Sequence, residues 1–114
     1  MTVNDKDAAE AEFQAQMAAL CEAFVRGLPA RHAALAAAWR DCADDANEPA
    51  WARLREVAHK LSGSASNYGF EALGTAAREL DKLLSGHVHC RVRGQAEPAV
   101  SRLRDALDGV IASA

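Results

Sequence analysis

Apolar residues recur at steps of three and four positions along almost the whole chain, and this spacing is the strongest constraint on its fold. Such a period places the apolar side chains on one face of an α-helix. One stripe consists of Phe13, Met17, Leu20, Cys21, Phe24 and Leu28. Half of the 114 residues are hydrophobic, but only 5% are aromatic, and much of the rest is alanine, the best helix former. The sequence therefore predicts an all-α protein and offers little from which to build a β-sheet.

Breaks between the stripes divide the chain into five predicted helices. The expected ranges are about 7–26, 29–44, 48–68, 70–84 and 98–111. Gly27 and Pro29 separate the first two helices, and Gly69 is well placed as a left-handed stop after the third. Residues 85–95 have no clear period and include two glycines, so we expect a loop there.

The connections between these helices are short, so consecutive helices should lie antiparallel with their stripes facing one another. We expect one domain over residues 1–114, built as an up-and-down antiparallel four-helix bundle with an additional N-terminal helix. Asn47 is a plausible cap for the helix that follows it. Residues 1–7 are expected to fray.

The formal net charge of -3 argues against nucleic acid as the main partner, because binding to a phosphate backbone needs a basic surface. No apolar run approaches the roughly 20 residues needed to cross a bilayer, and the polar, acidic N-terminus is unlike a secretory signal. Cys21, Cys42 and Cys90 are widely spaced and suggest no disulfide framework. We expect a cytoplasmic protein with no membrane partner, and a monomer by default.

His59 is the residue of most chemical interest. Successive helix residues turn by about 100°, which places His59 roughly 140° from Leu54 and outside the apolar stripe of its helix. Arg55, Ser62, Gly63 and Ser66 share the side that carries His59. This face combines a nucleophile, a cation, two hydroxyls and a gap where Gly63 lacks a side chain. An inert surface histidine is the simpler alternative.

Residues 58–84, AHKLSGSASNYGFEALGTAARELDKLL, resemble the core motif of histidine phosphotransfer (HPt) domains from multistep two-component signalling. The matching positions are His59, Leu61, Gly63, the small residues 64–66, Gly69 and Leu73. The resemblance implies a helical bundle with a phosphoaccepting histidine exposed midway along one helix, and that histidine is His59.

The same resemblance implies the partners and the chemistry. His59 would accept a phosphoryl group from the aspartate of a response-regulator receiver domain, or return it, and a hybrid or sensor histidine kinase would stand elsewhere in the relay. The receiver would hold Mg²⁺, so no cofactor and no metal are expected on this chain. Glu56 stands alone near His59, and the chain has no Gly-rich phosphate loop. We therefore expect a phosphoryl carrier and not an independent kinase or phosphatase.

One position departs from the family pattern. Most members have a lysine three residues after the histidine, where this chain has Ser62. Lys60 lies about 100° around the helix from His59, so it cannot simply replace that lysine. Arg55 lies one turn before His59 and is the preferred substitute cation, with Ser62 donating a hydrogen bond. Alternatively, Arg55 only pairs with a carboxylate on the helix surface, and transfer is then less efficient.

Two other classes of function stay open. The change from lysine to Ser62 also suits a docking module that binds a receiver or kinase as an inhibitor or adaptor without being phosphorylated. The second alternative is a metal site at His87, His89 and Cys90. A structural zinc site usually has four ligands, so a solvated loop is the better interpretation of these three residues.

Overall fold

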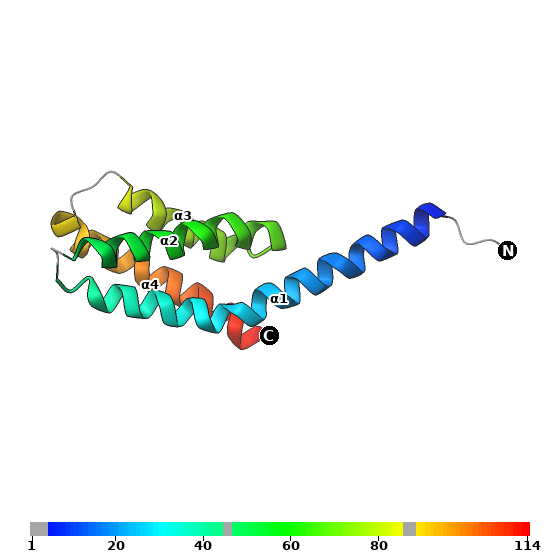
Figure 1. The fold of residues 1–114 in the computed structure, drawn as a ribbon, viewed down its shortest axis with the longest axis horizontal. Coiled ribbons are helices and arrows are strands. Elements are labelled where there is room, and N and C mark those ends of the chain that lie inside the picture. The colour runs from blue at the N-terminus through cyan, green and yellow to red at the C-terminus, as the bar shows by residue number, and fades with distance from the viewer. Residues whose placement is uncertain (1–4, 45–46, 86–88) are drawn as a thin grey trace.

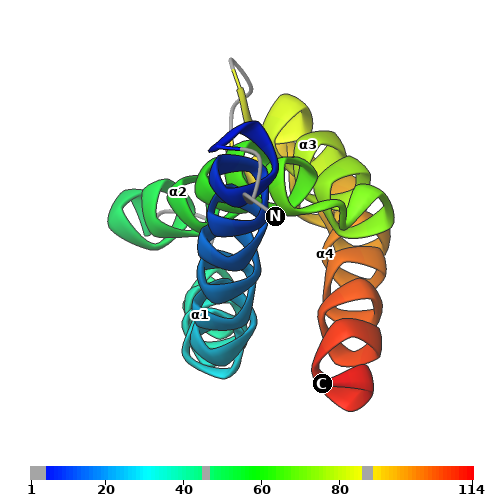
Figure 2. The same cartoon turned by 90° about the vertical axis from the view of Figure 1, so that its right-hand side faces the viewer.

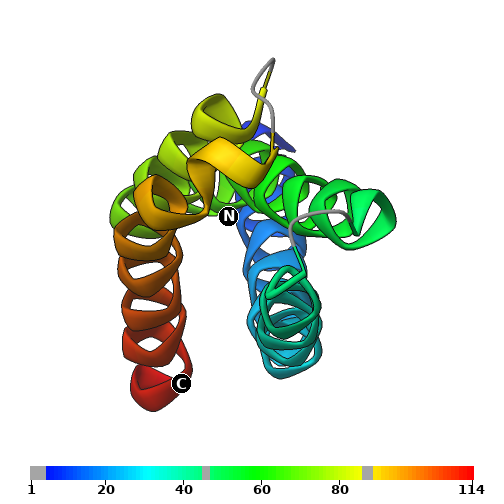
Figure 3. The same ribbon diagram turned by 90° about the vertical axis from the view of Figure 1, so that its left-hand side faces the viewer.

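The computed structural model describes residues 5–44, 47–85 and 89–114, without the side chains of 89–92. This part of the chain is helical and contains no strand. Its elements are α1 (Asp5–Asp41), α2 (Glu48–Ala65), the 3₁₀ turn η1 (Ser66–Tyr68), α3 (Glu71–Leu84) and α4 (His89–Ser113). Consecutive helices run in opposite directions (Figure 1), and the views along the bundle show α1 beside α2 and α3 beside α4 (Figures 2 and 3). The all-α, antiparallel four-helix bundle is confirmed.

The prediction of a separate N-terminal helix is wrong. The ranges 7–26 and 29–44 belong to one 37-residue helix, α1, which contains Pro29. Its buried residues Phe24, Leu28 and Leu35 lie on both sides of the proposed break. Packing of this continuous stripe against the bundle outweighs the local preference of glycine and proline to end a helix.

The core lies between the inner faces of all four helices. Its largest fully buried side chains are Trp51, Leu28, Leu35, Leu54, Leu61, Leu73, Leu80, Leu103, Leu107, Val100 and Cys42. Most of these residues belong to the apolar stripes of the predicted helices. Cys42 is buried, whereas Cys21 is half-buried. No helix in the described ranges is long and apolar enough to span a membrane.

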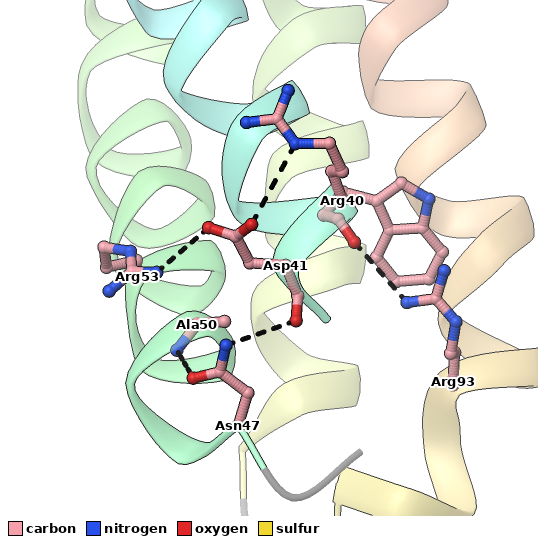
Figure 4. A network of polar contacts seen from close by, with 7 residues as sticks. Arg40, Asp41, Asn47, Ala50, Arg53 and Arg93 are labelled. Atoms are coloured by element: carbon pink, nitrogen blue, oxygen red, sulfur yellow. Dashed lines mark hydrogen bonds and ion pairs between the residues drawn. The ribbon is translucent and has the colours of Figure 1, made fainter. Parts of the chain in front are cut away.

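The connection from α1 to α2 is fixed by polar contacts (Figure 4). The side-chain oxygen of Asn47 accepts a hydrogen bond from the backbone N–H of Ala50 at 3.3 Å, which confirms the predicted cap. The Asn47 amide donates to the Asp41 carbonyl, and Arg53 pairs with the Asp41 carboxylate, both at 3.3 Å. These contacts tie the last turn of α1 to the first turn of α2.

Gly69 makes the turn from α2 to α3. Its φ of 85° is left-handed, as predicted, and this conformation strains any residue with a Cβ. The Gly69 N–H donates to the Ser66 carbonyl and the Phe70 N–H to the Ala65 carbonyl. These bonds close the end of α2 and send the chain back as α3.

The predicted loop at 85–95 is wrong over most of its length, because α4 already begins at His89. The guanidinium of Arg93 lies 4.2 Å from the centre of the Trp39 ring and donates to the Trp39 carbonyl at 3.4 Å. Ala96 is fully buried. These contacts with α1 favour a helix despite Gly94 and Pro98. His87 and the side chains of His89 and Cys90 lie outside the described residues, and so does the metal site suggested for them.

Candidate functional site

His59 stands on the exposed flank of α2, with 72% of its side chain accessible. Its neighbours along the helix, Ala58 and Leu61, are fully buried. The ring is therefore open to a partner while the backbone that carries it is fixed by the core. This is the placement that the helical angle of His59 predicts.

Asp81, on α3, forms a hydrogen bond with the imidazole ring of His59. Its Oδ2 lies 3.0 Å from His59 Nδ1, and only 17% of its side chain is exposed. An ionised carboxylate has no proton to donate, so Nδ1 must carry the hydrogen of this bond. In a neutral ring the other nitrogen, Nε2, then has the lone pair and is available as the nucleophile.

Arg55 binds the other oxygen of the same carboxylate. Its Nε lies 3.5 Å from Asp81 Oδ1, and 54% of the arginine side chain is exposed. Asp81 thus joins Arg55 and His59, and the arginine balances the negative charge beside the imidazole. The pairing of Arg55 with a carboxylate is present, but it also holds the guanidinium on the side of α2 that carries His59.

An open hollow adjoins His59 and Arg55. It measures about 280 Å³ and is lined by Ala52, Arg55, Glu56 and His59. Gly63, one turn after His59, also faces open space, since a Cβ placed there would have no neighbour within 4 Å. In the described part of the chain, no helix fills the gap that Gly63 leaves. The surface therefore has room for a group the size of a phosphoryl on the imidazole.

The two serines differ in their surroundings. The Ser62 hydroxyl donates to the His59 carbonyl at 2.8 Å, so it lies beside the site but is engaged with the helix backbone. The Ser66 hydroxyl oxygen is buried and lies against Gly74 of α3, where a Cβ would collide with it. Ser66 shares the helical angle of His59, but α3 covers it, so its expected place on the partner-facing surface is wrong.

Lys60 is paired with Glu56 on the surface of α2. Its Nζ lies 3.0 Å from Glu56 Oε1, and both residues line a groove between α1 and α2. The groove measures about 570 Å³ and is lined by Gly27, Ala30, Arg31, Ala34, Arg53, Glu56, Val57 and Lys60. It has an apolar floor, a charged rim, and one lining residue, Glu56, in common with the hollow at His59. The angular argument that excludes Lys60 as a substitute for the family lysine is consistent with this position.

Sequence reasoning missed Asp81. The residue lies next to Leu80 on the flank of its helix, and helical periodicity predicts that position. Periodicity cannot predict which residue of α2 faces Asp81, because the register between the two helices depends on the turn at Gly69 and the contact at Gly74. Among the described residues, no group of three or more potential metal ligands is gathered in one place.

Comparison with known protein families gives a match. The model of the family described as "Hpt domain" matches residues 12–113, nearly the whole chain. No curated protein and no solved structure gives a significant match.

Proposed function

Because this chain belongs to the Hpt domain family, whose members carry phosphoryl groups in phosphorelays, we propose that His59 is its phosphoacceptor. It accepts a phosphoryl group from the aspartate of a receiver domain and can return it to one. The proposal rests on one observation: the imidazole of His59 is exposed, and its Nδ1 is hydrogen-bonded to the Asp81 carboxylate at 3.0 Å.

The hydrogen bond to Asp81 determines how the ring reacts. With Nδ1 protonated, the lone pair of Nε2 attacks phosphorus in line with the bond to the aspartate oxygen of the receiver. The N–P bond forms, the P–O bond breaks, and the receiver keeps a carboxylate. The ring gains positive charge as Nε2 bonds to phosphorus, and the nearby Asp81 carboxylate stabilises that charge. The reverse transfer uses the same arrangement.

Arg55 supplies the cation that Ser62 cannot. The phosphoryl oxygens carry negative charge throughout the transfer, and stabilising it is mainly electrostatic. Arg55 lies beside the site through its ion pair with Asp81, and we expect its half-exposed side chain to reach a group on Nε2. The Mg²⁺ needed for the aspartyl phosphate is held by the receiver.

The receiver docks over the groove between α1 and α2. Its apolar floor, at Ala30, Ala34 and Val57, suits an apolar helix face of a partner, and the rim at Arg31 and Lys60 suits acidic side chains. The groove meets the hollow at His59, so a partner seated there brings its aspartate to the imidazole. The relay also needs a sensor or hybrid kinase, and a cytoplasmic location of this carrier would suit exchange with both partners.

The alternative is a docking module that is never phosphorylated, and the departure at Ser62 favours it. The two are separated by incubating the chain with receiver domains loaded with phosphate from radiolabelled acetyl phosphate. A carrier acquires an acid-labile, base-stable label, and His59→Gln abolishes it without changing the helical content. Binding without label on the natural chain, or persistent label on the variant, would overturn the proposal.

A further inference from the structure

The first half of α1 projects beyond the bundle (Figure 1). At 1.5 Å per residue, a 37-residue helix is about 55 Å long, while α2 and α3 have 18 and 14 residues. The first buried residue of α1 is Phe24. Residues 5–23, here called the projecting segment, therefore extend without support from the other helices.

One face of the projecting segment is apolar. Phe13 and Leu20 are 61% and 51% exposed, and they are the exposed large hydrophobic residues of the described chain. With Met17 and Phe24 they follow steps of four, three and four, which is the spacing of a and d positions in a two-stranded coiled coil. Phe13 and Leu20 of this seam face solvent, and Met17 is partly buried. Phe24 is buried in the bundle, where it packs on Tyr68 and Phe70.

The charges of α1 indicate what covers this seam. The projecting segment begins with four carboxylates, Asp5, Asp7, Glu10 and Glu12, and one cation, Lys6, whereas Arg26 and Arg31 follow its end. This acidic surface is unsuited to an anionic membrane, which attracts basic amphipathic helices. A second α1 in the same direction would set carboxylates against carboxylates. In the opposite direction, with Met17 of one helix opposite Leu20 of the other, Glu10 and Glu12 of each helix lie near Arg26 of the other.

We propose that two copies of this chain pair through antiparallel projecting segments. In this arrangement a positions meet d positions, so Met17 of each copy packs near Leu20 of the other, and Phe13 packs near Cys21. An apolar hollow of about 370 Å³, lined by Cys21, Glu22, Val25, Arg26 and Ala114, lies at the level that the second Phe13 reaches. The contact is isologous and closes as a dimer.

Pairing of this kind leaves His59 exposed. His59 lies on α2 and is hydrogen-bonded to Asp81 of α3. The seam lies on the part of α1 that precedes the bundle. The two bundles would stand at opposite ends of the paired helices, each with an exposed His59. A dimer replaces the monomer that we expect by default from the sequence.

Sedimentation equilibrium of the full chain tests the pairing. The natural chain should have twice the chain mass of 12.1 kDa. Phe13→Glu and Leu20→Glu each place a charge in the seam and should weaken dimerisation at least about tenfold. Ala15→Glu, on the opposite face of the same helix, is the matched control and should leave the dimer intact. A monomeric natural chain, or equal loss of the dimer in the control, would overturn the inference.

Cross-linking tests the direction. In a chain with Cys42→Ala, Cys90→Ala and Phe13→Cys, a bismaleimide should join position 13 of one copy to Cys21 of the other. Links between equal positions, 13 to 13 and 21 to 21, would show a parallel pair and refute the arrangement. Phe13→Glu and Leu20→Glu should still accept phosphate at the natural rate, which separates this interface from the site.

Discussion

Replacing Asp81 by asparagine perturbs the bond that fixes the imidazole of His59. The variant keeps the size of the side chain but loses its charge, so it can no longer stabilise the positive ring that forms as Nε2 takes up phosphorus. The amide can also present its N–H₂ to Nδ1, which would favour the ring tautomer protonated on Nε2. That tautomer has no lone pair at the outer nitrogen.

The magnitude follows from the geometry. A hydrogen bond to a charged group contributes about 1.5–3 kcal/mol, and the 3.0 Å separation with a mostly buried carboxylate supports a value in that range. Because the histidine side chain is 72% exposed, solvent reduces the contribution of this hydrogen bond to about 1–2 kcal/mol. This corresponds to transfer about 5- to 30-fold slower.

Rapid-quench measurement of transfer from a phosphorylated receiver is the assay. Glu79→Gln is the matched control, because it removes a carboxylate from the same helix that pairs with Arg102 at 3.3 Å, away from His59. The control should transfer at the natural rate. Unchanged transfer in Asp81→Asn, or equal slowing in both variants, would refute the role given to Asp81.

The remaining predictions concern the flanks of the site and the packing of α2 on α3. Arg55→Ala should slow transfer about fivefold, as loss of about 1 kcal/mol would, while Lys60→Ala should not; equal rates in the same assay would contradict the role of Arg55. Gly63→Ala should raise the free energy of unfolding in urea by about 0.5–1 kcal/mol, since nothing obstructs a Cβ there; a loss of stability would show that the space is occupied. Gly74→Ala should lower the free energy of unfolding by about 1–3 kcal/mol, because the added Cβ collides with the Ser66 hydroxyl. Adding Ser66→Ala should restore most of this loss, and absence of rescue would contradict this packing.

The sequence predicts those parts of the fold that depend on periodicity and single-residue chemistry. The stripes of α2 and α3 become core, Asn47 caps α2, and Gly69 is left-handed. His59 is exposed because its helical angle excludes it from the core. Each of these features depends on residues within one or two helical turns of one another.

The missed features depend on contacts between distant residues. Pro29 does not end α1, because burial of Leu28 and Leu35 continues the helix across it. Arg93 packs on Trp39, 54 positions away, and supports a helix where local composition indicates a loop. Asp81 meets His59 only through the register of α3 on α2, which no local pattern encodes.

Phosphorus–nitrogen coupling in NMR spectra of the ¹⁵N-histidine-labelled, phosphorylated chain tests the site most directly, because it identifies both the residue and the ring atom. The hydrogen bond between Nδ1 and Asp81 predicts phosphorus on Nε2 of His59, with Nδ1 still protonated. Phosphorus on Nδ1, on another histidine, or absent after incubation with phosphorylated receivers would contradict the account.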